Sequence, residues 1–232
     1  FILTNLLVGT YQVIFKNTLG WVAPSPAQVT VAENQQTNVV GVYTYASTNR
    51  LVLYYPCDDP PITPVIDYSG YGNHGTASNV TFNAAGYSNG CYAFNGTNSF
   101  ITAPDDDSYD TLQFTITMWV KSRDPSPGIE RGILGKHREA YNTMYYWVYQ
   151  VRQTNIIRGT MVGNVYNDFR DADGRADPII DGWGMVTLTY NGTNMALYVN
   201  GELTEKTPMS NYTGNAYNLL VGAGEWSMYT PT

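Results

Sequence analysis

The residues best suited to bind an ion lie in the segment DYSGYGNHG at residues 67–75. A carboxylate, a hydroxyl, an amide and three glycines fall within nine residues. Calcium takes about six to eight oxygen ligands from carboxylates, amides and backbone carbonyls, and glycines let the backbone turn those carbonyls toward one point. The segment therefore predicts a structural calcium site with Asp67 and Asn73 as ligands. The alternative is a tight loop in which Asp67 caps backbone amides.

A second candidate site is the aromatic run at residues 145–151. Alternation along a strand places Tyr145, Trp147 and Tyr149 on one face and Tyr146 and Val148 on the other. Aromatic rings stack on the apolar C–H faces of sugars, so the first three residues are predicted to bind a glycan. The alternative is that this face belongs to the core, because aromatic side chains bury large areas. Two acidic stretches, residues 105–107 and 168–177, are interpreted as solvated loops.

The composition bounds the kind of protein that carries these residues. Lys+Arg 12 against Asp+Glu 19 gives a net charge of -7, which argues against a nucleic-acid partner. The 20 tyrosines and 22 glycines favour β-structure with polar turns. A hydrophobic share of 43% argues against disorder. No apolar run approaches the roughly 18 residues of a membrane span.

Short alternating segments bounded by turn residues predict strands along the whole chain. They lie at residues 10–15, 27–31, 39–45, 51–56, 91–96, 99–104, 114–122, 145–151, 184–191, 195–203 and 218–222. Residues 192–194 are predicted to close a hairpin, and Asn200-Gly201 marks another tight turn. No helical period longer than two turns occurs. The pattern predicts an all-β sandwich or jelly roll.

Cys57 and Cys91 are the only cysteines, and both fall on expected strands. A bridge between them would close a loop of about 35 residues and contribute about 3–4 kcal/mol. We predict a disulfide in an oxidising, extracellular setting. The alternative is a pair of small buried thiols that never meet.

Several landmarks occur in order along the second part of the chain. They are LVLYYPCDD at 51–59, the D-x-S-G-x-G-N-x-G loop at 67–75, GCYAFNG at 90–96, FTITMWVKS at 114–122 and ALYVNG at 196–201. This series resembles the laminin-G-like, concanavalin-A-like lectin jelly-roll superfamily, over residues 50–232. The resemblance implies a jelly-roll sandwich in which an ion ties the glycine-rich loop to a final acidic strand. No segment after Gly224 resembles that strand.

The chain lacks the residue patterns of catalysis. Jelly-roll glucanases use paired carboxylates, and their E-x-D-x-x-E signature does not occur. A serine or cysteine nucleophile needs a positioned histidine, but His74 and His137 lie in predicted loops or beside basic residues. Zinc spacings of the C-x-x-C or H-x-x-x-H type are also missing. We therefore expect a protein that is not an enzyme.

Residues 1–46 are too few for a stable sandwich of their own. The patterns G-T-Y-x-V-x-F at 9–15 and G-W-x-x-P at 20–24 are similar to the small repeat-like β-domains of large secreted bacterial proteins, which act as stalks. We expect a partial immunoglobulin- or transthyretin-like β-domain at 1–46, followed by the jelly roll at 47–232. The chain begins at Phe1, so we expect an interior piece of a longer secreted or surface protein.

The predicted function is a non-catalytic, lectin-like module for extracellular adhesion or recognition. It is expected to bind a glycan or a neighbouring surface protein and to hold a structural calcium. The alternative is a repeating structural subunit of an extracellular fibre or sheath. In that case open sheet edges would be completed by a strand from another subunit.

Overall fold

The structure is a computed structural model that is divided by its contacts into two units, residues 1–51 and 52–232. The described residues are 6–15, 21–42, 44–45, 51–61, 64–122, 130–136, 145–151, 154–163, 168–180, 182–210, 212 and 214–222. Residues 46–50 and the segment after Gly224 lie outside these ranges. Within the described ranges, no helix is long and apolar enough to cross a membrane.

The first unit contains two short antiparallel ladders. Strand β1 (Gly9–Val13) pairs with β3 (Ala27–Val31), and β2 (Trp21–Val22) pairs with β4 (Thr44–Tyr45). The strand expected at 39–45 is reduced to the two residues of β4. An immunoglobulin- or transthyretin-like sandwich in this part of the chain stays a prediction.

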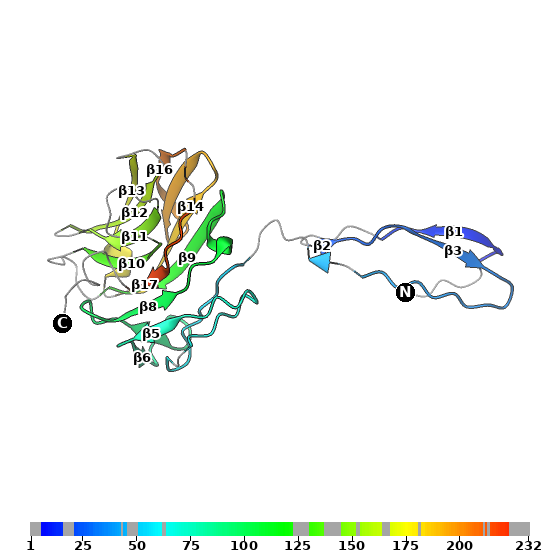
Figure 1. Ribbon diagram of the computed structural model, residues 1–232, viewed down its shortest axis with the longest axis horizontal. Coiled ribbons are helices and arrows are strands. Elements are labelled where there is room, and N and C mark those ends of the chain that lie inside the picture. The colour runs from blue at the N-terminus through cyan, green and yellow to red at the C-terminus, as the bar shows by residue number, and fades with distance from the viewer. Residues whose placement is uncertain are drawn as a thin grey trace. The chain divides into compact units, whose positions relative to one another are not determined.

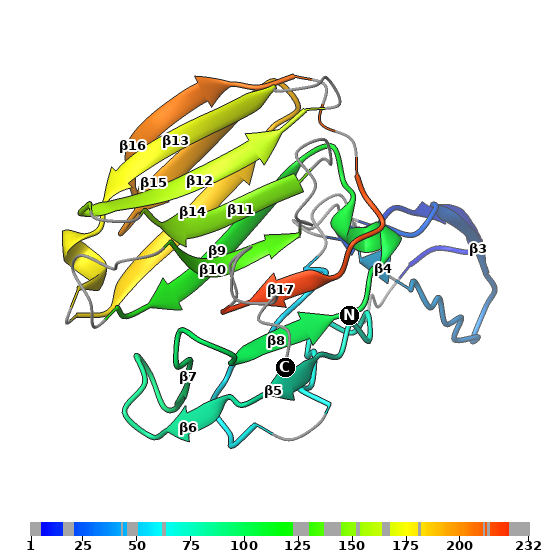
Figure 2. The same cartoon turned by 60° about the vertical axis from the view of Figure 1, so that its left-hand side comes forward.

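The second unit is a sandwich of two antiparallel sheets (Figures 1 and 2). The seven-stranded sheet has the order β13 (Phe169–Arg175), β12 (Ile156–Val162), β11 (Tyr145–Gln150), β10 (Arg131–Lys136), β17 (Leu219–Val221), β8 (Phe100–Ala103) and β5 (Thr76–Ser78). The four-stranded sheet has the order β16 (Glu202–Pro208), β15 (Asn194–Val199), β14 (Gly184–Tyr190) and β9 (Phe114–Val120). A separate hairpin joins β6 (Thr81–Asn83) to β7 (Cys91–Ala93), and two short 3-10 turns are η1 (Asp107–Tyr109) and η2 (Asp177–Ile179). The all-β prediction is confirmed.

The core lies between the two sheets and follows from the alternation of the strands. Along β14, every second residue from Gly184 to Tyr190 is buried, as a period of two requires for a sheet with one covered face. Leu188 of β14 and Leu197 of β15 are fully buried in this core. Burial of each side chain contributes about 1.5–3 kcal/mol to the free energy of folding. Gly159 of β12 lets them approach the opposite sheet, because a Cβ at Gly159 would lie 2.7 Å from a methyl group of Leu188.

The two predicted tight turns connect the strands of the four-stranded sheet. β14 and β15 form the predicted hairpin, and the Asn191 side chain accepts hydrogen bonds from the backbone N–H groups of Thr193 (3.0 Å) and Asn194 (2.8 Å). Asn200 and Gly201 both have positive φ, 53° and 83°. That conformation matches the right-handed twist of the strands on either side, so β15 returns directly into β16.

Residues 51–60 form no strand, although a strand was expected at 51–56. The backbone groups of this segment bond to side chains instead of to a neighbouring strand. The N–H of Tyr54 donates to Asp67 (2.9 Å), and the C=O of Val52 accepts from Asn73 (2.8 Å). The apolar side chains of the segment still pack against the core.

Candidate functional site

Strands β11, β12 and β13 lie side by side in the seven-stranded sheet (Figure 2). The face of these strands that is turned away from the four-stranded sheet carries polar side chains. Residues that are directly paired across an antiparallel ladder lie on the same face. The two paired rows are Trp147, Thr160 and Asp171, and Tyr149, Arg158 and Asp173. Their sequence neighbours Tyr146, Val148 and Ile157 belong to the core cluster on the other face. We call Tyr149, Arg158, Thr160, Asp171 and Asp173 the outer-face cluster.

Arg158 is held between two carboxylates in this cluster. Its Nε and Nη2 atoms donate to the two oxygens of Asp173 at 2.5 and 2.8 Å, and its Nη1 atom lies 3.3 Å from Oδ2 of Asp171. Thr160 donates its hydroxyl to Asp171 at 2.7 Å. The bonds to Asp173 raise the pKa of Arg158 above its ordinary value, so the guanidinium stays charged. The side chains of Arg158, Asp171 and Asp173 are 27%, 43% and 34% exposed, enough to meet a ligand.

The aromatic residues of β11 lie under this polar layer. The rings of Trp147 and Tyr149 stack on each other with centroids 3.8 Å apart and an interplanar angle of 17°. They form a small cluster with Val162. Burial raises the pKa of Tyr149, and hydrogen bonds with Thr160 and Arg158 offset part of that rise.

The two rings are only 5% and 6% exposed. This burial favours the packing role that was set beside sugar stacking for Trp147 and Tyr149, because little ring surface remains for a ligand. Tyr145 is paired with Val162 on the same face, and its side chain lies outside the described part of the structure. A direct part in ligand binding stays a prediction for all three residues.

A groove of about 610 Å³ opens beside the cluster. It is lined by Ile156, Asp173, Gly174, Arg175, Pro178, Val199, Asn200, Glu202, Leu203 and Thr204. Asp173 therefore belongs both to the outer-face cluster and to the groove. An apolar wall with a few polar groups is the usual composition of a small-molecule site.

The groove lies where strand β13 runs beside strand β16, and side chains of β16 bond to the backbone of β13. Glu205 accepts from the N–H of Asp173 at 2.6 Å, and Thr207 donates its hydroxyl to the C=O of Asp171 at 2.7 Å. The two sheets are thus joined along this edge. The backbone that carries Asp171 and Asp173 is held in place on both sides.

The predicted metal ligand Asp67 is 5% exposed and caps the glycine-rich loop. Its Oδ1 atom accepts from the N–H groups of Tyr54 (2.9 Å) and Ser69 (2.8 Å), and its Oδ2 atom accepts from the Ser69 hydroxyl (2.7 Å) and the Asn73 N–H (3.0 Å). Burial alone would raise the pKa of Asp67, but these hydrogen bonds outweigh it and lower the pKa.

Asn73 uses its amide to hold other segments rather than to face Asp67. Its side-chain NH₂ donates to the C=O of Val52 (2.8 Å) and to the Ser108 hydroxyl (3.1 Å). Its backbone C=O accepts from the Tyr55 hydroxyl (2.6 Å). Among the described residues, no group of three His, Cys, Asp or Glu side chains is placed to hold a metal ion. The contacts are those of the loop-capping alternative, and calcium at Asp67 and Asn73 stays a prediction.

A family model described as the concanavalin A-like lectin/glucanases superfamily matches residues 95–231, more than half of the chain. The chain belongs to this superfamily. The match contains the whole outer-face cluster and the groove, whereas the glycine-rich loop at 67–75 precedes it. A comparison with curated proteins gives no match.

Three solved structures share the concanavalin A-like fold. A mutant of HCR/D aligns with a TM-score of 0.56 and 17% identity over 70% of this chain and 41% of that one. The botulinum neurotoxin type G receptor binding domain aligns with a TM-score of 0.55 and 21% identity, over 77% of this chain and 45% of that one. The third structure is domain 4 of AbnA, a GH43 extracellular arabinanase from Geobacillus stearothermophilus, in complex with arabinotriose. It aligns with a TM-score of 0.51 and 16% identity, over 69% of this chain and 78% of that one. The chain spans less than half the length of each of the first two structures. At identities this low, the three TM-scores show a common fold and nothing more.

The disulfide predicted between Cys57 and Cys91 is wrong, because no bridge joins them in this concanavalin A-like domain. Cys57 lies in the segment without a strand, and its thiol donates to the C=O of Tyr55 at 3.5 Å. The Cys91 thiol, at the start of β7, is instead directed to the C=O of Ala85 at 4.0 Å. Burial, together with the nearby charge of Asp58, raises the pKa of the Cys57 thiol to about 12.

We expect both cysteines to be titrated as thiols in denatured, unreduced protein. In the folded protein Cys57 should react slowly with iodoacetamide near about pH 8, because the thiolate is the nucleophile and a raised pKa leaves little of it. Mass spectrometry of alkylated peptides measures the rate, and a Cys57→Ser variant identifies the slow site. A denatured, unreduced chain with no titratable thiol would contradict the structure.

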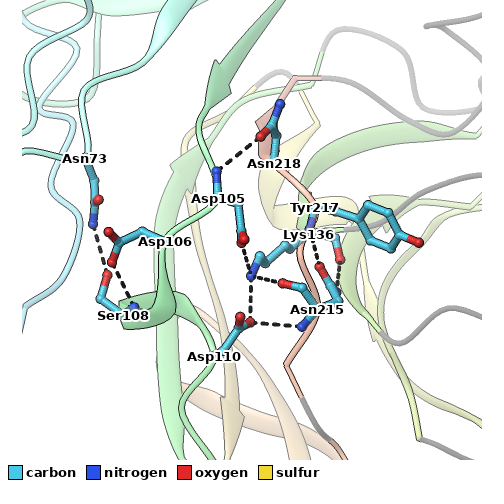
Figure 3. A network of polar contacts seen from close by, with 9 residues as sticks. All are labelled: Asn73, Asp105, Asp106, Ser108, Asp110, Lys136, Asn215, Tyr217 and Asn218. Atoms are coloured by element: carbon cyan, nitrogen blue, oxygen red, sulfur yellow. Dashed lines mark hydrogen bonds and ion pairs between the residues drawn. The ribbon is translucent and has the colours of Figure 1, made fainter.

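Sequence reasoning missed a buried lysine at the end of β10 (Figure 3). The side chain of Lys136 is completely buried, and its Nζ atom lies 2.7 Å from Asp105, 2.6 Å from Asp110 and 2.6 Å from the C=O of Asn215. Asp105 had been placed in a solvated acidic run; residues 105–107 are exposed in the structure, but Asp105 also forms an ion pair with the buried Lys136. The sequence signal was the position of Lys136 at the end of the apolar strand GILGK. His137, which follows it, lies outside the described residues.

Proposed function

We propose that this chain is a non-catalytic glycan-binding module of an extracellular protein and that the outer-face cluster binds the sugar. The carrying observation is the partly exposed Arg158, fixed between Asp171 and Asp173 beside an open groove. Membership in a lectin/glucanase superfamily supports the proposal. The structurally similar arabinanase domain, which was solved in complex with arabinotriose, also supports it.

The chemistry of the cluster fits sugar hydroxyls. A carboxylate accepts hydrogen bonds from neighbouring hydroxyl groups, and a guanidinium donates to their oxygens. Arg158 and the two carboxylates already hold one another in place, so binding orders few additional side chains and loses little affinity to entropy. The aliphatic wall of the groove, which includes Ile156 and Leu203, offers a surface for the C–H face of a sugar ring.

Binding accounts for the cluster better than hydrolysis does. Glycoside hydrolysis needs a carboxylic acid and a second carboxylate that act from separate positions around the scissile bond. Asp171 and Asp173 are instead both bound to one guanidinium. Adhesion through the bound glycan, on a secreted or surface-displayed protein, is the biological role that we propose for such a module.

The alternative of a fibre subunit joined by strand exchange gains no support at the edge strand β13. Its outward backbone groups at Asp173 and Asp171 already bond to Glu205 and Thr207 of β16. An incoming strand would have to displace those side chains before it could pair. This edge is therefore a poor acceptor for a strand from another subunit.

We expect Asp171→Ala to weaken glycan binding by about 10- to 100-fold, because a hydrogen bond to a charged group contributes about 1.5–3 kcal/mol. An array of neutral and acidic oligosaccharides that includes arabinotriose identifies the ligand, and calorimetry measures the affinity. Asp107→Ala is the matched control, because Asp107 is an exposed aspartate of η1 outside both the cluster and the groove. A wild-type protein that binds no glycan on the array would overturn the proposal.

A further inference from the structure

Two aromatic rings stack on each other in the open on the other side of the sandwich. The centroids of Tyr87 and Trp119 lie 3.5 Å apart at an interplanar angle of 11°. Trp119 lies on the solvent face of β9, since Met118 and Val120 on either side of it pack against the core. Tyr87 belongs to the loop between β6 and β7. The two residues are 54% (Tyr87) and 42% (Trp119) exposed.

The loop presents Tyr87 in a fixed position. The N–H of Gly86 donates to the C=O of Asn89 at 2.9 Å, and the N–H of Ala85 donates to the Asn83 side chain at 2.9 Å. Gly86 packs directly on the backbone of Gly90, where any Cβ would collide with it. The turn is therefore closed by its own hydrogen bonds, and the ring of Tyr87 is stacked on Trp119 without a ligand.

Hydrogen-bonding groups lie on the turn that carries Tyr87 and on a segment in contact with that turn. Asn89, two residues after Tyr87, donates its amide to the carboxylate of Asp58 at 3.4 Å. The two segments are in contact, because a Cβ at Gly90 would lie 2.9 Å from the C=O of Asp58. An exposed aromatic ring whose own turn also carries an amide paired with a carboxylate matches a sugar, which has an apolar C–H face and hydroxyl groups at its rim.

We propose that Tyr87 and Trp119, with Asn89 and Asp58, form a second saccharide subsite. One sugar ring stacks on the open face of Tyr87, and its hydroxyls bond to the amide of Asn89 and the carboxylate of Asp58. The sugar is neutral, because the adjacent negative charges of Asp58 and Asp59 repel an acidic one. Two large aromatic rings exposed together are a frequent mark of a binding surface.

The inference rests on the proposed function and extends it from one binding site to two. The outer-face cluster lies on the outer face of the seven-stranded sheet, and Trp119 lies on the outer face of the four-stranded sheet. A short oligosaccharide cannot reach both, because the whole sandwich separates them. A chain with two such sites can cross-link two glycan chains and gain avidity.

Calorimetry with a neutral oligosaccharide selected on the array, or with arabinotriose, tests the subsite. Wild-type protein is expected to bind two equivalents per chain. Tyr87→Ala should remove one equivalent or weaken it more than about tenfold, and Tyr87→Phe should keep it because the ring remains. Tyr71→Ala is the matched control, since Tyr71 is a 40% exposed tyrosine of the glycine-rich loop at 67–75. Thermal melting of each variant confirms that the fold survives.

The outcomes separate the two proposals. If Asp171→Ala abolishes all binding and Tyr87→Ala changes nothing, the subsite is overturned and the outer-face cluster stands. If Tyr87→Ala alone abolishes binding, the subsite stands and the outer-face cluster is overturned. If the wild-type protein binds no saccharide, both are overturned.

Discussion

Lys136→Met is expected to lower the free energy of unfolding by about 3 kcal/mol or more, the largest effect of any single change considered. The substitution leaves Asp105 and Asp110 without their buried counter-ion and removes the donor to the C=O of Asn215. Urea unfolding followed by circular dichroism measures the loss. Lys206→Met is the matched control, because Lys206 is an exposed strand lysine, and it should change stability by less than about 0.5 kcal/mol.

A second variant identifies the cause of that loss. In the Lys136→Met background, Asp105→Asn with Asp110→Asn should recover part of the stability, because neutral amides are less costly than unpaired carboxylates in a buried setting. Figure 3 shows why the recovery is partial: the C=O of Asn215 still lacks the donor that Lys136 supplied. A loss below about 1 kcal/mol for Lys136→Met would contradict a buried charge network.

Asp67→Ala is expected to lower the free energy of unfolding by about 3 kcal/mol, since the N–H groups of Tyr54, Ser69 and Asn73 each lose their acceptor. The loss should be seen as a lower melting temperature and as a lower urea midpoint. Ser69→Ala is the matched control, because it removes the hydroxyl that donates to Asp67 and accepts from the Tyr71 N–H, but leaves the carboxylate that accepts from the three backbone N–H groups. It is expected to cost about 1 kcal/mol, and equal losses for the two variants would contradict the capping role.

The same carboxylate gives the protein a defined pH dependence. The folded pKa of Asp67 is lowered, because hydrogen bonds outweigh the opposing effect of burial, and its unfolded pKa is about 3.9. The stabilisation is therefore fully present above about pH 4 and is lost as the pH falls through the folded pKa. The stability difference between wild type and Asp67→Asn should shrink as the medium is acidified. A difference that stays constant through that range would contradict the lowered pKa.

Calcium at Asp67 and Asn73 has a separate signature. The prediction requires that a chelator lower the melting temperature of the wild type and leave Asp67→Ala unaffected. Identical wild-type melts in calcium and in chelator would reject the ion. The hydrogen bonds to Tyr54, Ser69 and Asn73 would then be the whole role of Asp67.

Strands with a clear period of two could be predicted from the sequence, and segments held by side chains could not. β9 and β14 alternate throughout, and one face of each packs on the core. The segment at 51–56 is equally apolar, but its backbone partners are Asp67 and Asn73, 13 and 21 residues further along. Local periodicity does not contain such distant partners.

The candidate site was hidden by the composition of β13, whose sequence is FRDADGR. This strand is polar on its outer face, and its inward positions include Ala172 and Gly174, which are buried but small. A small residue gives almost no hydrophobic signal, so the stretch was interpreted as a solvated loop. Little space is left for a side chain at Gly174, because side-chain atoms of Val199 and Thr204 lie 3.1 Å from where its Cβ would be. The charged outer face therefore belongs to a strand and not to a loop.

The position of β17 in the seven-stranded sheet determines when the sheet can be completed during synthesis. β17 is the last described strand in the chain, yet it pairs with both β10 and β8 in the middle of the sheet (Figure 2). Until residues 219–221 leave the ribosome, the strands β10–β13 and the strands β5 and β8 are two unconnected halves. The hydrogen bond from Asp105 to Asn218 closes a span of 113 residues, and such distant contacts form slowly. A nascent chain therefore carries two unpaired strands until a late step, when chaperone protection matters most.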